Sequence, residues 1–272
     1  MAKLAEVVSL FRERTGIAED VEITAEANPE DLTPQYCCGL FEFGVTRLSV
    51  GVQSLDDAVL ATVGRKGAET TVAGLKSAFS AGFTNVNADL ILGLPDEAPG
   101  GTFRALSKLL EEFPLSHASL YVLEEGAYPK TWKGRHADMD GVRAEYDRCR
   151  LLLLEKGFIH YEVSNFAKPG FESKHNWGYW NRNDVRGFGL SAASLWKGER
   201  LENATSFAGY YRGDLALKET LTEEDAKLEE ALCGMRTISM PKSLVGDTSK
   251  LAEFRDLGWI EERDEKILLT SA

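Results

Sequence analysis

The chain has 272 residues, 43% of them hydrophobic and 27% charged, and these values are typical of a folded globular protein and exclude the collagen-like, low-complexity and disordered classes. Its formal net charge of −12 argues against a nucleic-acid partner, because phosphate binding depends on clustered Lys and Arg. No apolar run approaches the roughly 20 residues of a membrane span, and "MAKLAEVVSLFRERTG" lacks the hydrophobic centre of a signal peptide, so we expect a cytoplasmic protein without a membrane span.

Predicted helices and strands alternate along the first part of the chain. Residues 4–11 are predicted to form a helix, because Leu4, Val7, Val8 and Phe11 fall on one helical face. A later helix begins with Thr33 as its N-cap and Pro34 in its first position. Another carries Phe103, Leu106 and Leu110 on one stripe. Strands are predicted at residues 21–27, 46–54, 84–95, 117–124 and 158–166.

The strands read as near-continuous apolar runs joined by crossover helices. This pattern is typical of a parallel sheet that helices cover on one or both faces, as in a barrel or an open doubly wound sheet. No G-x-G-x-x-G follows a predicted strand, which disfavours the dinucleotide-binding version of the fold.

The pattern changes after Leu195. Residues 221–237 form a strongly acidic amphipathic helix, and residues 251–270 read as a helix, a glycine turn and a two-stranded hairpin. This resembles a small winged-helix-like α+β appendage. We therefore predict a main domain at residues 1–212 and a small domain at residues 213–272. Because the small domain is acidic and would repel DNA, we interpret it as a packing or lid domain.

Three predicted strands each carry a polar side chain near the carboxyl end, where barrels and open sheets place their sites. These are Glu26, Gln53 and Asp89, and together they indicate one polar mouth that suits a ligand with ribose or amino-acid groups. Asp89 lies inside an apolar run and must be nearly buried. Two alternatives stay open: Asp89 bonds to backbone amides of a neighbouring loop, and Glu26 points at a solvent-facing crevice.

Several motifs in order resemble one family. "EANPEDLTP", "GVTRLSVGVQSLDDAVLATVGR", "GFTNVNADLILGLP", "YEVSNFAKPGFESKHNWGYW" and "GFGLSAASLW" are similar to the radical S-adenosylmethionine proteins related to oxygen-independent coproporphyrinogen III oxidase. "HNWGYW" matches the HNxxYW motif of the HemW-type haem chaperones better than the oxidase proper. The resemblance covers residues 21–196 and continues more weakly through the C-terminal domain of the HemN type.

The resemblance implies an open partial barrel of about six β/α units with S-adenosylmethionine across the carboxyl ends of the strands. Asp89 and Gln53 would bond ribose hydroxyls or polar edges, and Arg65 and Glu26 would serve the carboxylate and amino group. Two further positions would pack against adenine or ribose. The implied cofactor-binding residues are Glu26, Gln53, Arg65, Asp89, Val122 and Ala193.

The sequence departs from this family at its cluster-binding loop. The family holds a four-iron four-sulfur cluster with a CxxxCxxC triplet, and neither that triplet nor the family's GGGTP turn occurs here. The first two β/α units of the barrel are expected to be missing, with residues 21–27 left as an edge strand. Without the triplet, radical chemistry by this chain is unsupported. No zinc site is expected from the four scattered cysteines, Cys37, Cys38, Cys149 and Cys233.

The hexapeptide "HNWGYW" at residues 175–180 gathers aromatic surface around one histidine. Under the resemblance, His175 is a candidate axial ligand for haem iron, and the aromatic rings supply apolar surface for a porphyrin face. The alternative is an aromatic turn that seals the end of the barrel. Three other histidines have weaker cases as ligands: His117, His136 and His160.

Three functions follow from these observations. The first is a haem-binding chaperone that passes haem to an acceptor protein. The second is a radical enzyme of porphyrin biosynthesis like the coproporphyrinogen oxidase, which needs a cluster loop encoded upstream. The third is an inactive fragment, or half of an assembly that another polypeptide completes.

Overall fold

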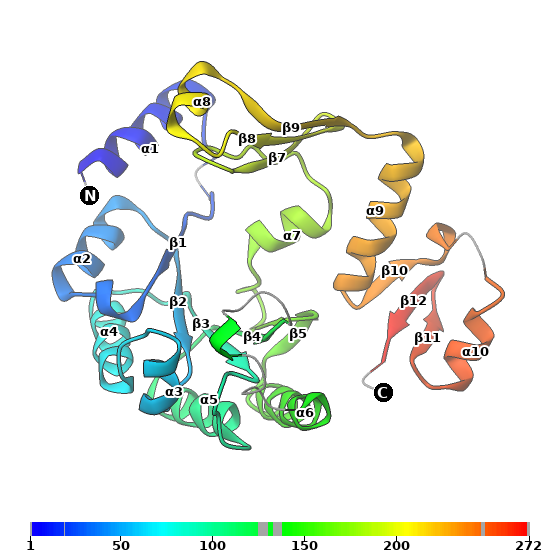
Figure 1. Ribbon diagram of the computed structural model, residues 1–272, viewed down its shortest axis with the longest axis horizontal. Coiled ribbons are helices and arrows are strands. Elements are labelled where there is room, and N and C mark those ends of the chain that lie inside the picture. The colour runs from blue at the N-terminus through cyan, green and yellow to red at the C-terminus, as the bar shows by residue number, and fades with distance from the viewer. Residues whose placement is uncertain (1, 19, 125–129, 133–137, 246–247, 271–272) are drawn as a thin grey trace. The chain divides into compact units, whose positions relative to one another are not determined.

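The computed structural model describes residues 2–18, 20–124, 130–132, 138–245 and 248–270. The chain divides into two compact units, Met1–His160 with Ser164–Glu172, and Tyr161–Val163 with Ser173–Ala272. Figure 1 colours the chain from blue at the N-terminus to red at the C-terminus.

The first unit holds the alternating helices and strands that the sequence predicts. Its helices are α1 (Ala2–Thr15), η1 (Pro29–Asp31), α2 (Pro34–Phe43), α3 (Asp57–Thr62), α4 (Ala68–Ser80), α5 (Gly101–Glu112), η2 (Lys130–Trp132) and α6 (Met139–Glu155). Its strands are β1 (Thr24–Ala27), β2 (Arg47–Gln53), β3 (Val86–Leu92), β4 (His117–Val122), β6 (Asn165–Ala167) and the start of β5 (Ile159–Glu162).

One six-stranded sheet organises the first unit, in the order β1-β2-β3-β4-β6-β5. Strands β1 to β4 are parallel, as predicted, and β1 stands at one end of the order. The prediction of one parallel strand at residues 158–166 is wrong. A turn at residues 163–164 divides this segment into β5 and β6, and β6 runs antiparallel to β4, because two short strands joined by a tight turn reverse the chain without a crossover helix.

The two faces of the parallel strands differ in character. Apolar residues such as Leu48, Val50 and Val52 are almost fully buried, while the alternate positions of β2 hold Arg47, Ser49, Gly51 and Gln53. The same period of two recurs in β3 and β4. The near-continuous apolar runs of the sequence are thus alternating strands, with one apolar face and one polar inner face.

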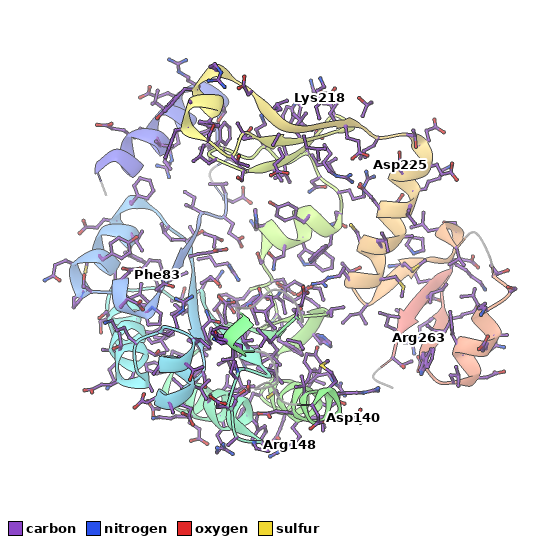
Figure 2. All side chains as sticks on the ribbon, in the orientation of Figure 1. Phe83, Asp140, Arg148, Lys218, Asp225 and Arg263 are labelled. Atoms are coloured by element: carbon purple, nitrogen blue, oxygen red, sulfur yellow. The ribbon has the colours of Figure 1, made fainter. Side chains whose placement is uncertain are left out.

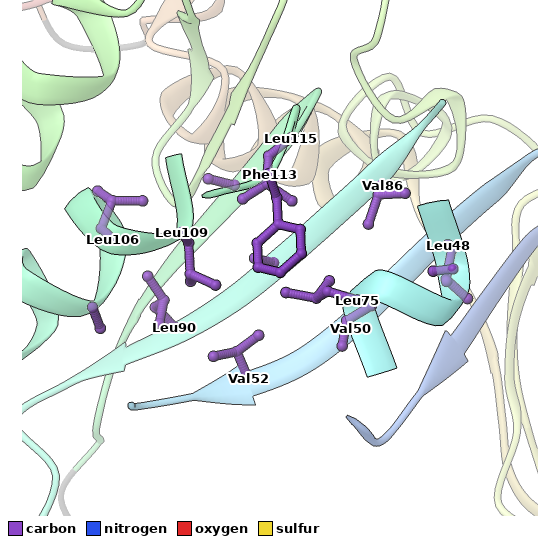
Figure 3. Close-up of a cluster of buried hydrophobic side chains, with 14 of the residues drawn as sticks. Leu48, Val50, Val52, Leu75, Val86, Leu90, Leu106, Leu109, Phe113 and Leu115 are labelled. Atoms are coloured by element: carbon purple, nitrogen blue, oxygen red, sulfur yellow. The ribbon is translucent and has the colours of Figure 1, made fainter. Parts of the chain in front are cut away.

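Helices cover the apolar face. Figure 1 shows α2, α4, α5 and α6 along one side of the strands, and the buried core between them and the sheet includes Leu75, Leu106 and Leu109 (Figure 3). Burial of such side chains supplies about 1.5–3 kcal/mol each and fixes the sheet against its helices. The polar inner face is left for a site.

Local signals start and stop these helices as the sequence predicts. The Thr33 side chain accepts a hydrogen bond from the Tyr36 amide, Pro34 occupies the first turn of α2, and Gly44 ends the helix with a φ of 94°. Helix α1 is also present, and on its predicted apolar face Val8 and Phe11 are half-buried, whereas Val7 is 48% exposed.

The second unit contains two small antiparallel sheets. Its helices are α7 (Lys174–Trp180), α8 (Phe207–Arg212), α9 (Glu223–Arg236), η3 (Lys242–Leu244) and α10 (Leu251–Asp256). Its strands are β7 (Ala193–Trp196), β8 (Glu199–Asn203), β9 (Leu215–Thr220), β10 (Ser239–Pro241), β11 (Ile260–Arg263) and β12 (Lys266–Leu269). The sheets have the orders β7-β8-β9 and β10-β12-β11.

The acidic helix and the terminal hairpin are confirmed at α9 and at β11 with β12. Asp225, labelled in Figure 2, lies in the first turn of α9 and forms a capping box with Thr222. A third strand, β10, joins the predicted hairpin. Met240, Leu251, Ile260 and Ile267 form the small core of this part.

The predicted domain boundary between residues 212 and 213 falls between α8 and β9. Strand β9 pairs with β8, so one sheet continues across this point, and the compact units divide near residue 173 instead. The separate domain at residues 213–272 stays a prediction. Among the described helices of both units, none combines the length and the hydropathy that a membrane crossing requires.

Candidate functional site

A pocket opens at the carboxyl ends of β1, β2 and β3, and we call it the strand-end pocket. Its volume is about 350 Å³, within the range of small-molecule sites. Its lining is strongly polar, with carboxylate, amide, guanidinium, phenol and hydroxyl groups. The lining residues are Glu26, Ala27, Asn28, Asp31, Tyr36, Ser49, Gly51, Gln53, Arg65 and Asp89.

The parallel register brings the predicted residues together. Glu26 lies opposite Ser49 in the pairing of β1 with β2, and Gly51 lies opposite Asp89 in the pairing of β2 with β3. Strand alternation then points these side chains to the inner face. Four of the six residues implied by the resemblance, Glu26, Gln53, Arg65 and Asp89, line one pocket; their role in cofactor binding stays a prediction.

The backbone at the end of β2 is adapted to the pocket. Gln53 has a φ of 66°, which is uncommon for a residue other than glycine, and the pairing with β3 shifts register between Gly51 and Gln53. A Cβ at Gly51 would lie 2.9 Å from the Gln53 Nε2. The bulge therefore aims the Gln53 amide across the space that Gly51 leaves open.

Asp89 is half-buried and held by side chains. Ser49 Oγ donates to Asp89 Oδ2 at 3.1 Å, and Asn87 Nδ2 donates to Asp89 Oδ1 at 2.8 Å. The alternative in which loop backbone amides bind Asp89 is therefore wrong. A carboxylate that accepts from two fixed donors keeps further lone pairs for a ligand hydroxyl.

Arg65 is the one cationic side chain among the described residues that line the strand-end pocket. Arg65 follows α3 and donates from Nη1 to the Asn28 side chain, whose Nδ2 lies 3.5 Å from Asp31 Oδ2. Glu26 is exposed, which agrees with the alternative that its side chain points at a solvent-facing crevice. The pocket thus offers a guanidinium for a ligand carboxylate and carboxylates for hydroxyls or an ammonium.

Sequence reasoning missed several lining residues, including Asn28, Asp31, Tyr36 and Ser49. Two of them had a readable signal. Ser49 is four residues before Gln53 and therefore on the same face of the strand. Asn28 directly follows the strand that carries Glu26.

Two implied cofactor residues do not line the strand-end pocket. Val122 ends β4 and is 38% exposed, and Ala193 begins β7 in the second unit. Val122 is offset because β4 extends past Asp89, which lies opposite Ser119 in the register. Contacts of both residues with adenine or ribose stay predictions.

The aromatic hexapeptide is helical, so the alternative that makes this segment a turn is wrong. Residues 174–180 form α7, whose N-cap Ser173 accepts a hydrogen bond from the Asn176 amide at 3.2 Å. His175 and Tyr179 are both exposed and one helical turn apart, with ring centroids 4.7 Å apart at 88°. The Ser173 cap favours a helix here, because its hydroxyl accepts from the Asn176 amide, which has no partner within the first turn of the helix.

The two tryptophans of α7 pack within the second unit. Trp177 lies 5.8 Å from the Tyr161 ring, and the Arg236 guanidinium lies 4.9 Å from the Trp180 ring. Both are half-buried, so Tyr179 is the aromatic neighbour that shares an exposed helix face with His175. This face could accept a flat ligand against one ring edge.

His117 and His160 are held by packing inside the first unit. His117 is fully buried on β4, and burial, with a smaller effect of Arg47, lowers its pKa well below the usual value. His160 stacks on Phe166 at 4.2 Å. His136 lies outside the described residues.

The donor set for an iron–sulfur cluster does not converge in the described part of the chain. Cys37 is buried and Cys38 exposed on α2, Cys149 is buried on α6, and Cys233 lies on α9. Burial raises the pKa of the Cys149 thiol to about 12, which disfavours the thiolate that binds metal. These four cysteines do not fit a cluster site.

A carboxyl group with an unusual pKa lies beyond the end of β3. Glu97 accepts hydrogen bonds from Thr102 Oγ1 at 3.2 Å and from Ser54 Oγ at 3.4 Å. Burial, followed by the nearby Glu145 carboxylate, raises the pKa of Glu97 to about 7. Glu145 itself accepts from the amides of Gly100 and Phe103 at the start of α5.

Comparisons with known proteins show which proteins the chain is similar to. Residues 2–104 match the model of the radical SAM superfamily. A protein named Heme chaperone HemW from Lactococcus lactis is 33% identical over 250 residues, covering 84% of this chain and 64% of that protein. The same name is carried by a Bacillus subtilis protein that is 35% identical over 233 residues, covering 79% of this chain and 60% of its own length.

A solved structure shares the fold. Coproporphyrinogen III oxidase (HemN) from Escherichia coli, titled a radical SAM enzyme, matches with a TM-score of 0.82 and 21% identity, over 99% of this chain and 71% of that one. The chain spans about half to two-thirds of the length of the curated relatives it matches. The structural match concerns the architecture of the α/β sheet and its helices.

Proposed function

Because the chain belongs to the radical SAM superfamily, among relatives named as haem chaperones, we propose that it binds haem and transfers it to an acceptor protein. S-Adenosylmethionine is proposed as the ligand of the strand-end pocket. The observation that carries the proposal is the exposed His175 and Tyr179 face of α7 within the "HNWGYW" motif. A cytoplasmic location belongs to the same proposal.

The chemistry of the strand-end pocket supports S-adenosylmethionine. Asp89, held by Ser49 and Asn87, presents oxygens that accept from ribose hydroxyls. Arg65 pairs with the ligand carboxylate and Glu26 with its ammonium. Gly51 leaves room for the ligand, since a Cβ there would reach within 2.9 Å of the Gln53 amide. When bound, S-adenosylmethionine supplies a sulfonium centre and an adenosyl group.

The face of α7 supports haem. An exposed imidazole on a regular helix can approach iron without rearrangement of the backbone, and a neighbouring phenol ring adds apolar surface for a porphyrin. Solvent exposure suits a carrier, since haem held at a surface can pass to an acceptor. We propose that the acceptor is a protein.

Haem titration tests this function. Addition of haem to the purified chain is expected to give a Soret band, and His175→Ala is expected to shift that band and weaken binding, because the iron loses a strong-field nitrogen ligand. His160→Gln is the matched control: it removes an imidazole that stacks on Phe166 and is expected to leave the spectrum unchanged. Identical spectra for wild type and His175→Ala would remove His175 from the site.

The radical-enzyme alternative finds no support among these side chains. Its cluster needs three convergent thiolates, and Cys37, Cys38, Cys149 and Cys233 are dispersed over three helices. Release of 5′-deoxyadenosine under anaerobic reduction tests it. We expect no release above a no-protein control, and clear release would overturn this preference.

A fragment without ligands is the remaining alternative, and thermal melting separates it from a binding protein. A ligand that binds the folded state raises the melting temperature by simple linkage. We expect the melting temperature to rise with added S-adenosylmethionine. An unchanged melting temperature at saturating concentrations would support the inactive fragment.

A further inference from the structure

A connected row of polar side chains crosses the inner face of the sheet from the strand-end pocket to β6. Its members are almost all buried, which is costly for polar groups unless each finds a partner. Two of them, Ser49 and Asp89, line the strand-end pocket. We call this the polar row, and it consists of Ser49, Asn87, Asp89, His117, Ser119 and Asn165.

Proton counting at Asp89 fixes the direction of the bonds near the pocket. A carboxylate only accepts, so the Asn87 nitrogen that lies 2.8 Å from Asp89 Oδ1 must be the donor. The same Nδ2 donates its second proton to Ser49 Oγ at 2.7 Å. The Ser49 hydroxyl is then free to donate to Asp89 Oδ2, at 3.1 Å. Both oxygens of Asp89 therefore receive a proton from the row.

The hydrogen-bond donors and acceptors farther from the pocket, from Asn87 to Asn165, are assigned by the same proton count. With its nitrogen turned to Asp89, Asn87 presents Oδ1, which only accepts, to His117 Nδ1 at 2.7 Å. Ser119 has one proton and lies 2.7 Å from Asn165 Oδ1 but 3.2 Å from Asn87 Oδ1, so its proton goes to Asn165. His117 must therefore carry its proton on Nδ1, and burial keeps the ring neutral.

We propose that His117 and Asn87 are positioning residues for the strand-end pocket. The Nδ1-protonated tautomer of His117 fixes the Asn87 amide, and Asn87 in turn holds the Asp89 carboxylate in the orientation that receives a ligand hydroxyl. Neither residue touches the ligand. The inference rests on the proposed binding of S-adenosylmethionine, and it adds a fully buried histidine to the determinants of that affinity.

Paired substitutions at His117 test the positioning role by calorimetric titration with S-adenosylmethionine. His117→Leu removes the donor and is expected to raise the dissociation constant about 5-fold, the usual effect of one neutral hydrogen bond. His117→Asn restores it, because the asparagine Nδ2 is bonded to Cγ as the imidazole Nδ1 is, and is expected to bind as wild type does. Equal affinities for the leucine variant and wild type would overturn the proposal.

Asn87→Asp gives a readout that packing damage does not imitate. A second carboxyl beside Asp89 repels its charge when both are ionised, so one of the two retains a proton at low pH. We expect the ratio of variant to wild-type dissociation constants to be about 30-fold at pH 8 and to fall as the pH is lowered. The other groups that face the row or the pocket are Arg47, His117, Glu26, Asp31, Tyr36 and Arg65, and division by the wild-type value removes the contribution of those that titrate alike in both proteins. A ratio independent of pH contradicts the inference.

Nitrogen-15 NMR of the wild-type imidazole tests the inference without any variant. The spectrum of His117 is expected to show a protonated Nδ1 and an unprotonated Nε2 from pH 5.5 to 8, and the opposite tautomer would overturn the proposal. Failures are distinguishable. If wild type binds no S-adenosylmethionine, the proposed ligand is wrong and the inference falls with it; if wild type binds and the His117 and Asn87 variants match it, the positioning role alone is wrong.

Discussion

Gly51 lies opposite Asp89 in the parallel register of β2 and β3, and we call the part of the strand-end pocket that these two residues line its floor. Asp89 contributes a carboxylate, and Gly51, which has no side chain, leaves free space. A Cβ on Gly51 would meet the Gln53 Nε2 at 2.9 Å and the Ala27 carbonyl oxygen at 3.9 Å. The absence of a side chain at this position therefore determines how closely a ligand can approach the strands.

Gly51→Ala is expected to weaken binding of S-adenosylmethionine at least about 10-fold, because the new methyl group displaces the Gln53 amide and fills the floor of the pocket. Isothermal titration calorimetry measures the affinity. Gly178→Ala on α7 is the matched control, because its Cβ would meet nothing closer than Asn183 Nδ2 at 4.0 Å. Equal affinities for Gly51→Ala and wild type would show that the ligand does not reach the floor.

Asp89→Asn keeps the shape of the side chain and removes its charge. Hydrogen bonds to a charged group contribute about 1.5–3 kcal/mol, so we expect the dissociation constant for S-adenosylmethionine to rise about 10- to 100-fold. Glu69→Gln in the first turn of α4 removes an exposed charge outside the pocket and is expected to bind normally. A similar loss in both variants would mean that net charge, and not the site, determines the affinity.

The sequence predicted the pocket better than it predicted the strand faces. Glu26, Gln53 and Asp89 were found because a polar residue near the end of an apolar strand is conspicuous, and parallel strands bring such ends to one edge. Asn87 and His117 were missed as partners, because nothing in either local pattern says which residues of neighbouring strands share a register.

Two segments differ from a reading of the sequence for different physical reasons. Residues 158–166 look like one strand because apolar and β-prone residues run through them, and the turn at residues 163–164 depends on pairing with β4. The alternative reading makes "HNWGYW" an aromatic turn, yet the Ser173 cap starts a helix there. Strand pairing decides the first segment, and a helix cap decides the second.

Thr222→Ala is expected to destabilise α9 by about 1 kcal/mol, since it removes the side-chain half of the capping box with Asp225. The chain has two compact units, so hydrogen exchange of the α9 amides reports this loss more directly than a global melt. Thr222→Ser keeps the hydroxyl and is expected to exchange at the wild-type rate. Unchanged protection in the alanine variant would mean that packing alone holds the helix end.

Glu97→Gln is expected to stabilise the protein at pH 8 and to leave it unchanged at pH 4. Burial first, and then Glu145, raise the pKa of Glu97 from 4.5 to about 7, so the folded state holds a proton that the unfolded state releases between these values. Stability is therefore fully present below pH 4.5 and is lost as the pH rises to about 7. After solvent screening the loss is on the order of 2 kcal/mol. The glutamine keeps a neutral partner for Thr102 and Ser54 and does not ionise. Urea denaturation of both proteins across this range should show curves that separate between pH 4.5 and 7, whereas parallel curves would show that Glu97 ionises normally in the folded protein.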